Sequence, residues 1–245
     1  MARTRTYFIS DAHLGSRCDG PDTREVRLAK FCTAIEKDAR ALYLLGDIFD
    51  FWFEYRNAVP AAHLRALAAF RGLVDAGVPV TYVGGNHDFW IGDYLTREAG
   101  LRLVFAPLDV TIDGLKINLR HGDGFAPHGR LYPFFRAVVR NRVNRALYRL
   151  IHPDIGIPLA RWVSSRSRMH NDRTLDMERV TQRYRDAARA FFEADNAPDA
   201  LLMGHTHRAD LQHYGAGTYI NTGEWLRNFD YTCLENGQFS LKRFS

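Results

Sequence analysis

Five short clusters of Asp, His, Asn and Gly, each following a short apolar run, constrain this chain more than any other feature. The apolar runs predict β-strands. Because α/β folds place their sites at the carboxyl ends of strands, we expect a functional site where these clusters lie. The clusters are Asp11-Ala12-His13, Gly46-Asp47, Gly85-Asn86-His87-Asp88, His121-Gly122-Asp123 and Gly204-His205-Thr206-His207.

The first part of the chain alternates predicted strands with predicted helices, and Asp113-Gly114 between two apolar runs indicates a hairpin. From about Leu131 to Phe192 the apolar residues recur at helical spacing, and after Pro198 the strand pattern returns. We therefore expect an α/β domain made of residues 1–125 and 196–245, interrupted by a helical insertion at 126–195. The predicted strands outside the hairpin are 7–10, 41–45, 80–83, 103–105, 200–203, 211–214, 218–221, 231–234 and 239–244, and the first two helices are 24–37 and 61–76.

The insertion is strongly basic. Residues 126–189 contain 14 Arg, no Lys and 5 acidic residues, although the whole chain has a net charge of only +5. Within it, one amphipathic helix is expected to end at His152-Pro153, a second to begin at Ile157-Pro158 and a third at Asn171-Asp172. Guanidinium groups favour bidentate binding of phosphate, and arginines beside apolar residues suit an anionic membrane surface. The alternative is an ordinary helix with a solvated arginine face.

Composition bounds the class of protein. Of 245 residues 46% are apolar, which is enough for a substantial core. The three cysteines (Cys18, Cys32 and Cys233) are widely spaced, so neither a disulfide framework nor a cysteine metal site is expected. The start of the chain has no apolar core of signal-peptide length, and no later segment reaches the span of a transmembrane helix. We expect a cytoplasmic protein, free or peripherally bound to a membrane.

The residue types in the clusters point to metal chemistry. Asp, Asn and His are ligands for borderline-hard divalent cations such as Mn²⁺, Fe²⁺ or Zn²⁺. In extended chain, residues two apart turn to the same side, as in Asp11 with His13 and His205 with His207. One such pair alone is weak evidence, because Asp and His are common in turns. All five clusters in order at strand ends favour a two-metal phosphoesterase, in which two ions about 3.5–4 Å apart act on one phosphate.

The order and identity of the clusters resemble the calcineurin-like metallophosphoesterase family, whose motifs are DxH, GD, GNHD/E, HG and GHxH. The resemblance covers the chain outside the insertion and implies a β-sandwich flanked by helices. It also implies that His87 hydrogen-bonds the reacting phosphate or leaving oxygen, that Asp88 orients His87, and that Asp47 bridges two metals, with Mn²⁺ preferred over Fe²⁺, Zn²⁺ or Co²⁺. The implied ligand sets are Asp11, His13, Asp47 and His207 for one metal and Asp47, Asn86, His121 and His205 for the other.

The residues that flank the motifs are similar to those of the UDP-2,3-diacylglucosamine hydrolase family of lipid A biosynthesis. That resemblance implies water attack on the α-phosphate of the lipid-linked UDP-sugar, giving UMP and 2,3-diacylglucosamine 1-phosphate, at the cytoplasmic face of the inner membrane. It implies that the insertion caps the site and accommodates the acyl chains. One departure is His87, since the well-known members read GNRDF where this chain has GNHDF. The residues expected to bind the diphosphate are Arg166, Arg168 and Asn171, and those expected to line the acyl pocket are Phe134, Phe135, Val138, Val139 and Trp162.

Three other functions compete with this interpretation. A metallophosphoesterase for another nucleotide, phosphodiester or phosphoprotein would use the same ligands. A nuclease would suit the basic insertion, but the chain has no long Lys-rich stripe or recognisable nucleic-acid module, so nucleic acid is not the expected partner. A metal-free interaction scaffold would be expected to lack ligands, and every ligand position is filled here. The sequence leaves the oligomeric state open.

Overall fold

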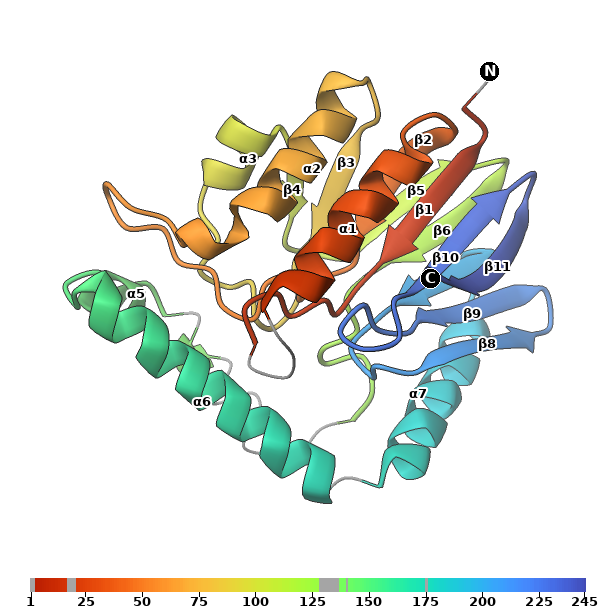
Figure 1. Cartoon of the computed structure of the whole chain (residues 1–245). Coiled ribbons are helices and arrows are strands. Elements are labelled where there is room, and N and C mark those ends of the chain that lie inside the picture. The colour runs from red at the N-terminus through yellow and green to blue at the C-terminus, as the bar shows by residue number, and fades with distance from the viewer. Residues whose placement is uncertain (1–2, 17–20, 128–136, 140, 175) are drawn as a thin grey trace.

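The computed structural model describes residues 3–16, 21–127, 137–139, 141–174 and 176–245, and it describes no side chain at 21–23 or 165–174. Two β-sheets form the centre of the molecule, and helices cover their outer faces (Figure 1). The expected α/β class is confirmed. Among the described helices, none combines the length and the apolar character needed to cross a membrane.

The first sheet contains β1 (Arg5–Ile9), β2 (Ala39–Leu44), β3 (Val80–Val83), β4 (Arg102–Val104), β10 (Asp230–Glu235) and β11 (Gln238–Arg243). Its strand order is β11-β10-β1-β2-β3-β4. Strands β1 to β4 pair in parallel, whereas β10 and β11 are antiparallel additions at one edge. Parallel neighbours require crossover connections. These are supplied by three helices: α1 (Pro21–Ile35), α2 (Leu64–Asp75) and α3 (Tyr94–Ala99).

The second sheet contains β5 (Leu108–Ile112), β6 (Leu115–Leu119), β7 (Ala200–Met203), β8 (Ala209–Tyr214) and β9 (Gly217–Thr222). Its order is β5-β6-β7-β9-β8, with β6, β7 and β9 parallel and the two edge strands antiparallel. Strands β5 and β6 form the hairpin predicted at Asp113-Gly114. All the strands predicted from the sequence are present, with bounds that differ by a few residues.

Three apolar clusters hold these layers together. Phe8, Val83 and Ile220 belong to the cluster between the two sheets. A larger cluster, which includes Phe31 and Phe70, joins the first sheet to α1 and α2. The third joins the second sheet to α7 (Met177–Phe192). The chain is therefore layered helix–sheet–sheet–helix, as the calcineurin-like resemblance implies.

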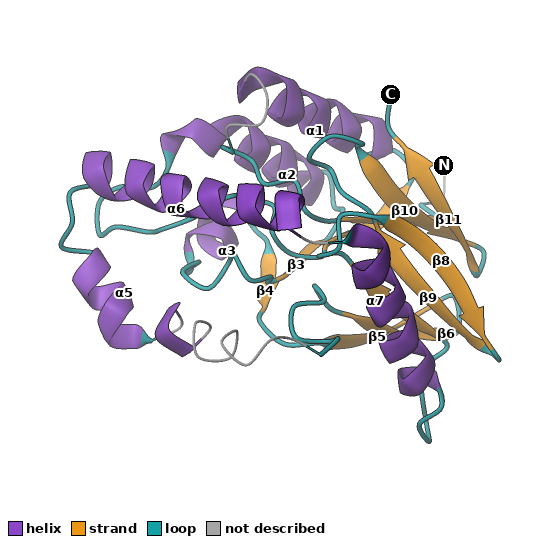
Figure 2. Ribbon diagram, turned by 90° about the horizontal axis from the view of Figure 1, so that it is seen from below, coloured by secondary structure: helices purple, strands orange, loops and turns teal. Residues whose placement is uncertain are grey.

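The helices of the predicted insertion pack in two different ways. Helix α7 buries Val180, Tyr184 and Ala188 against the second sheet, as an ordinary layer helix does. Helix α5 (Arg142–Tyr148) buries no residue, and α6 (Pro153–Thr174) runs below the strand ends, apart from the two sheets (Figure 1). Seen from below, α6 lies in front of those strand ends (Figure 2). We call α5 and α6 the cap. The division at 126 and 195 stays a prediction, but α7 packs with the sheet domain.

Two predicted helix starts are wrong. The second helix begins at Pro153 rather than at Ile157-Pro158. Proline is favoured in the first helical turn, because no intrahelical partner exists there for a backbone N–H, so Pro153 can start the helix. Pro158 lies inside the helix, where its nitrogen has no N–H to donate to the carbonyl four residues earlier. The third helix begins after Asp176, whose carboxylate accepts hydrogen bonds from the N–H groups of Glu178 and Arg179. That side chain caps the helix, whereas Asn171 and Asp172 lie inside α6.

Candidate metal centre

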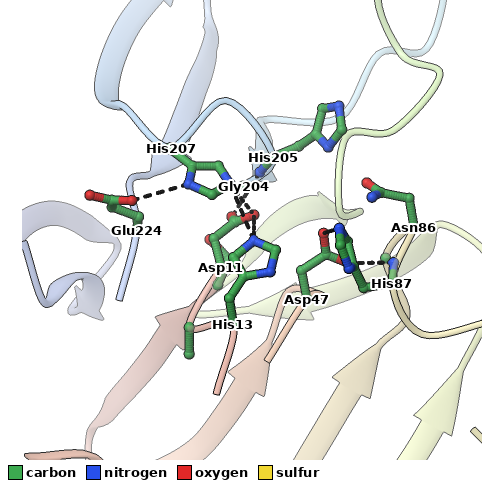
Figure 3. A network of polar contacts seen from close by, with 12 residues as sticks. Asp11, His13, Asp47, Asn86, His87, Gly204, His205, His207 and Glu224 are labelled. Carbon is green, nitrogen blue, oxygen red and sulfur yellow. Dashed lines mark hydrogen bonds and ion pairs between the residues drawn. The ribbon is translucent and has the colours of Figure 1, made fainter. Parts of the chain in front are cut away.

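The five clusters meet at the carboxyl ends of five strands, three from the first sheet and two from the second. Strands β1, β2 and β3 lead into Asp11, Asp47 and Asn86, while β6 and β7 lead into His121 and His205. The ends of the sheets are joined across the sandwich, since His121 Nδ1 donates to the carbonyl oxygen of Leu45 at 2.8 Å. Figure 3 shows Asp11, His13, Asp47 and His207 gathered beyond the strand ends.

One half of the site is formed by Asp11, His13 and His207. The Nε2 atoms of the two histidines lie 3.3 Å apart, and Asp11 Oδ1 lies 3.3 Å from His207 Nε2 and 3.9 Å from His13 Nε2. These three atoms lie close enough together to hold one ion. Two ring nitrogens facing each other beside a carboxylate oxygen form a donor set that suits a divalent metal.

The other half is formed around His121. Its Nε2 atom lies 3.3 Å from Asp47 Oδ2, 3.2 Å from Asn86 Oδ1 and 3.2 Å from His205 Nδ1. Ligand atoms of Asp47, Asp11 and His121 lie close enough together to hold one ion. The same is true of Asp47 with His13 and His87. Asp47 therefore lies between the two halves, as the bridging role requires. The structure brings all seven predicted ligands together; their binding of metal stays a prediction.

The backbone at these positions is strained. Non-glycine residues with positive φ are uncommon and cost about 1–3 kcal/mol each, and they concentrate at active sites. Neighbouring glycines let the chains approach, because a Cβ atom on Gly85 would overlap Asp47 Oδ1 and one on Gly204 would overlap Asp11 Oδ2. Five of the seven predicted ligands have positive φ: Asp11 (51°), His13 (40°), Asp47 (54°), His205 (71°) and His207 (59°).

Burial and buried carboxylates divide the histidines into two kinds. Burial lowers the pKa of His13 to about 4 and that of His205 to about 3, so both rings are neutral near pH 7 and can offer a lone pair to a metal. Burial also acts to lower the pKa of His207, but the charges of Asp11 and Glu224 outweigh burial and raise this pKa to about 10. Asp47 and Asp11 likewise hold the pKa of His121 well above its ordinary value. The carboxylates thus create a strongly cation-attracting centre.

Glu224 is a site residue that the sequence analysis missed. Its Oε2 atom lies 3.1 Å from His207 Nδ1, so Nε2 of the same ring is left to face Asp11 (Figure 3). Asn228 Nδ2 donates to the other oxygen of Glu224 at 3.2 Å. Such outer carboxylates fix the orientation of metal-binding histidines. Glu224 follows β9 without a recognisable motif, so only the fold reveals it.

The orientation of His87 differs from the one implied by the resemblance. His87 Nδ1 donates to the backbone carbonyl of Asp50 at 2.9 Å, and Nε2 turns toward the cluster, 3.9 Å from Asp47 Oδ2. Asp88 instead accepts from the N–H groups of Gly85 and Asp47 and from the hydroxyl of Tyr82. Burial raises the pKa of Asp88 to about 6. Asp88 therefore holds the loop together, and the structure assigns the contact with the ring to Asp50.

The cap contacts the site through α6. Ser164 Oγ donates to Asp50 Oδ1 at 2.9 Å. The described part of the expected acyl lining is open, since Val138 and Trp162 are exposed, and the carbonyl of Val139 accepts from Trp90 Nε1 at 2.8 Å. Arg166, Arg168 and Asn171 lie on α6 with side chains outside the described residues. Phe134 and Phe135 also lie outside the described residues.

Aromatic residues anchor the cap, which the sequence analysis did not foresee. The ring of Tyr148 on α5 lies 4.8 Å from Phe53, 4.6 Å from Trp90 and 5.8 Å from Phe51, measured between centroids. Such pairs add about 0.5–1.5 kcal/mol each beyond area burial. The aromatic run after Asp47 therefore fills the core with Phe49 and docks the cap with Phe51 and Phe53.

Comparisons with known proteins agree with this geometry. The family model for calcineurin-like phosphoesterases matches residues 4–209, and the chain belongs to that family. It is thus a phosphoesterase enzyme. It is 33% identical to a UDP-2,3-diacylglucosamine hydrolase of Porphyromonas gingivalis, covering 98% of this chain and 97% of the relative. It is 31% identical to the protein of the same name in Stenotrophomonas maltophilia, covering 96% and 97%. A solved archaeal phosphodiesterase shares the fold with a TM-score of 0.51 at 13% identity, covering 98% of this chain and 99% of that one.

Proposed function

We propose that the protein hydrolyses the diphosphate of UDP-2,3-diacylglucosamine, with water attacking the α-phosphate to give UMP and 2,3-diacylglucosamine 1-phosphate. The observation that carries this proposal is the contact between the strand-end cluster and helix α6 of the cap. Ser164 on α6 reaches Asp50 beside the strand-end cluster, while Trp162 and Val163 next to it remain 52% and 49% exposed. A site for phosphate thus lies beside apolar surface that the described protein leaves uncovered. The names of the two relatives support the same substrate.

We assign two divalent metal ions to the strand-end cluster, with Mn²⁺ preferred and Fe²⁺, Zn²⁺ or Co²⁺ as alternatives. The donors fit such ions because they combine imidazole nitrogens, those of His13 and His205 on rings that are neutral near pH 7, with buried carboxylates and one amide oxygen. Bound there, the ions would polarise the phosphate and activate water. One ion would be held by Asp11, His13, Asp47 and His207, and the other by Asp47, Asn86, His121 and His205.

His87 is the residue assigned to the reacting phosphate. Its Nδ1–H donates to the Asp50 carbonyl, so Nε2 faces the place of a phosphate oxygen beside Asp47, to which it would donate as the Nε2–H of the imidazolium ring. A preorganised donor of this kind acts on the charge that develops during the reaction. Arg166, Arg168 and Asn171 follow Ser164 on the same helix and are assigned to the diphosphate. An arginine at the position of His87, as in the GNRDF motif, would present a cation to the same group.

The outer side of the cap is assigned to an anionic membrane, at the cytoplasmic face of the inner membrane. Val143, Leu147 and Leu150 of the α5 region are exposed, and so are the neighbouring Arg142 and Arg149. Apolar side chains among arginines bind an interface that carries negative headgroups. A peripheral enzyme would meet its acylated substrate there.

The test is a head-to-head assay in the presence of Mn²⁺. UDP-2,3-diacylglucosamine should be cleaved far more efficiently than nucleotide diesters without acyl chains, and in ¹⁸O-labelled water the label should appear in UMP. Label in the sugar phosphate would refute attack on the α-phosphate. Equal cleavage of simple diesters would indicate a phosphoesterase with another substrate. Turnover that does not depend on added metal would contradict the metal assignment.

A further inference from the structure

Asp50 lies where the cap, the catalytic histidine and the metal cluster meet. It is almost fully buried, and its backbone N–H donates to the carbonyl of Leu14 at 3.0 Å, which fixes the Asp50 main chain beside the first cluster. Its carbonyl accepts from His87 Nδ1. Its carboxylate lies 4.0 Å from His87 Nδ1 and 3.7 Å from His13 Nδ1. A buried carboxylate at such a junction needs a hydrogen-bond donor.

Ser164 supplies a donor from the cap. Its hydroxyl donates to Asp50 Oδ1 at 2.9 Å and lies 3.4 Å from His87 Nδ1. Asp50 and His87 both come from loops after strands of the first sheet, whereas Ser164 belongs to α6. The hydroxyl thus reaches from the cap to the side of the imidazole that faces away from the metal cluster.

We propose that Ser164 and Asp50 are positioning residues for His87, so that docking of the cap fixes the catalytic ring. The Asp50 carbonyl keeps a proton on Nδ1, and the Ser164–Asp50 hydrogen bond holds the loop and the ring against the cap. Nε2 of His87 is then presented to the phosphate before substrate binds. Neither Ser164 nor Asp50 needs to touch the substrate for this. The inference rests on the proposed function only in requiring that His87 faces the reacting phosphate.

A residue that positions His87 and a residue that binds substrate affect different kinetic constants. A residue that acts through His87 should change kcat with little change in KM, for every substrate that is cleaved. A residue that binds acyl chains or the sugar should instead change KM, and only for substrates that carry those groups. The Ser164 hydroxyl is a better test than Asp50, because Asp50 also lies close to the predicted ligand His13.

The experiment is a double-mutant cycle on full-length protein loaded with Mn²⁺. Ser164→Ala should lower kcat roughly 10-fold, the order expected for a hydrogen bond to a charged group. It should do so for both the diacyl UDP-sugar and bis(p-nitrophenyl) phosphate. In the His87→Gln background the same change should cost nothing further. Ser164→Thr, which keeps a hydroxyl, should recover most of the loss. Ser240→Ala, which removes a hydroxyl bound to the Cys233 carbonyl on a distant strand, is the matched control and should change nothing.

Two kinetic outcomes overturn the proposal: an equal loss in the presence and absence of His87, or a rise in KM without loss of kcat. A readout independent of turnover separates this failure from failure of the proposed function. In ¹⁵N NMR of the histidine rings, His87 should carry a proton on Nδ1, and Ser164→Ala should perturb the Nδ1 signal whereas Ser240→Ala should not. An unperturbed His87 signal in Ser164→Ala overturns the proposal even if no substrate is identified.

Discussion

The strand-end cluster and the cap distribute polar and apolar groups in opposite ways. In the cluster, carboxylates such as Asp11 and Asp47 are buried, and the backbone that carries them is strained. In the cap, Leu159 and Trp162 are exposed on a helix whose neighbour α7 buries its apolar side chains normally. Each arrangement is unfavourable by itself. The difference supports the two proposed assignments, which are cations in the cluster and an acylated substrate beside the cap.

Removing Asp47 tests the cluster alone and should have the largest effect. Asp47 lies between the two halves of the site, so Asp47→Ala should deprive both metals of a ligand. We expect turnover of diacyl UDP-sugar and of small diesters to fall to background, because the cluster serves every substrate. Metal analysis should find fewer than the two metal ions per chain expected for the unaltered protein. Normal turnover would disprove the assignment of Asp47.

His87 tests the boundary between cluster and cap. His87→Gln should lower kcat roughly 10²–10⁴-fold, as for loss of a proton donor or charge-stabilising group. Metal content should be unchanged, because Nε2 is assigned to phosphate rather than to metal. His87→Arg should keep part of the activity. If His87→Gln abolishes metal binding, His87 is a metal ligand and its assignment to the phosphate is wrong.

Glu224 tests whether the cluster depends on its outer carboxylates. Glu224→Ala removes the partner of His207 Nδ1, and metal affinity should fall roughly 10–100-fold, measured by titration of metal-free protein. Glu235→Ala on β10 makes the same change at a surface ion pair with Arg5 and should leave affinity unchanged. Equal affinity in the two variants would show that Glu224 does not support the site.

Substitution of one valine in α7 and one in the cap compares these two regions, and it should have the smallest effect of the four changes. Val180 on α7 is 9% exposed and Val163 on α6 is 49% exposed. Val180→Ala deletes buried methyl groups and should lower the free energy of unfolding by about 1–2 kcal/mol. Val163→Ala should change stability by less than about 0.5 kcal/mol. It should reduce kcat/KM a few-fold for acylated substrate alone. A reversed order of stabilities would contradict the assignment of α7 to the sheet domain.

The sequence was sufficient for the sheet domain and for the residues gathered at the site, because those residues directly follow apolar strands. Asp11, Asn86 and His207 could be found in this way, since strand direction alone places them at one end of the sandwich. The partner of His87 came from the resemblance instead, and the structure places a different residue, Asp50, against the ring. Nothing in Asn86-His87-Asp88 shows that Asp88 is occupied by backbone N–H groups, or that Asp50 lies nearer to the ring.

Ser164 and Glu224 were out of reach for a different reason. Each is a single residue without a motif, brought to the site by the packing of distant segments: 114 residues separate Ser164 from Asp50. The helical character of the insertion was predictable from its spacing. The partners of its helices were not, because α6 and α7 are both rich in arginine, and it is the fold that shows α7 packing Val180, Tyr184 and Ala188 against the second sheet.

The proposed role of the cap in binding acyl chains is tested most directly by comparing kcat/KM for UDP-2,3-diacylglucosamine and UDP-glucosamine. Burial of each methylene contributes about 0.8 kcal/mol before ordering costs, so removal of two acyl chains should lower kcat/KM by several orders of magnitude. The assay should use Mn²⁺-loaded enzyme and monodisperse substrate, with bis(p-nitrophenyl) phosphate as a control for the metal cluster. The account predicts a large ratio with unchanged cleavage of the control diester. Equal efficiency on the two UDP-sugars would contradict it, even with every metal ligand in place.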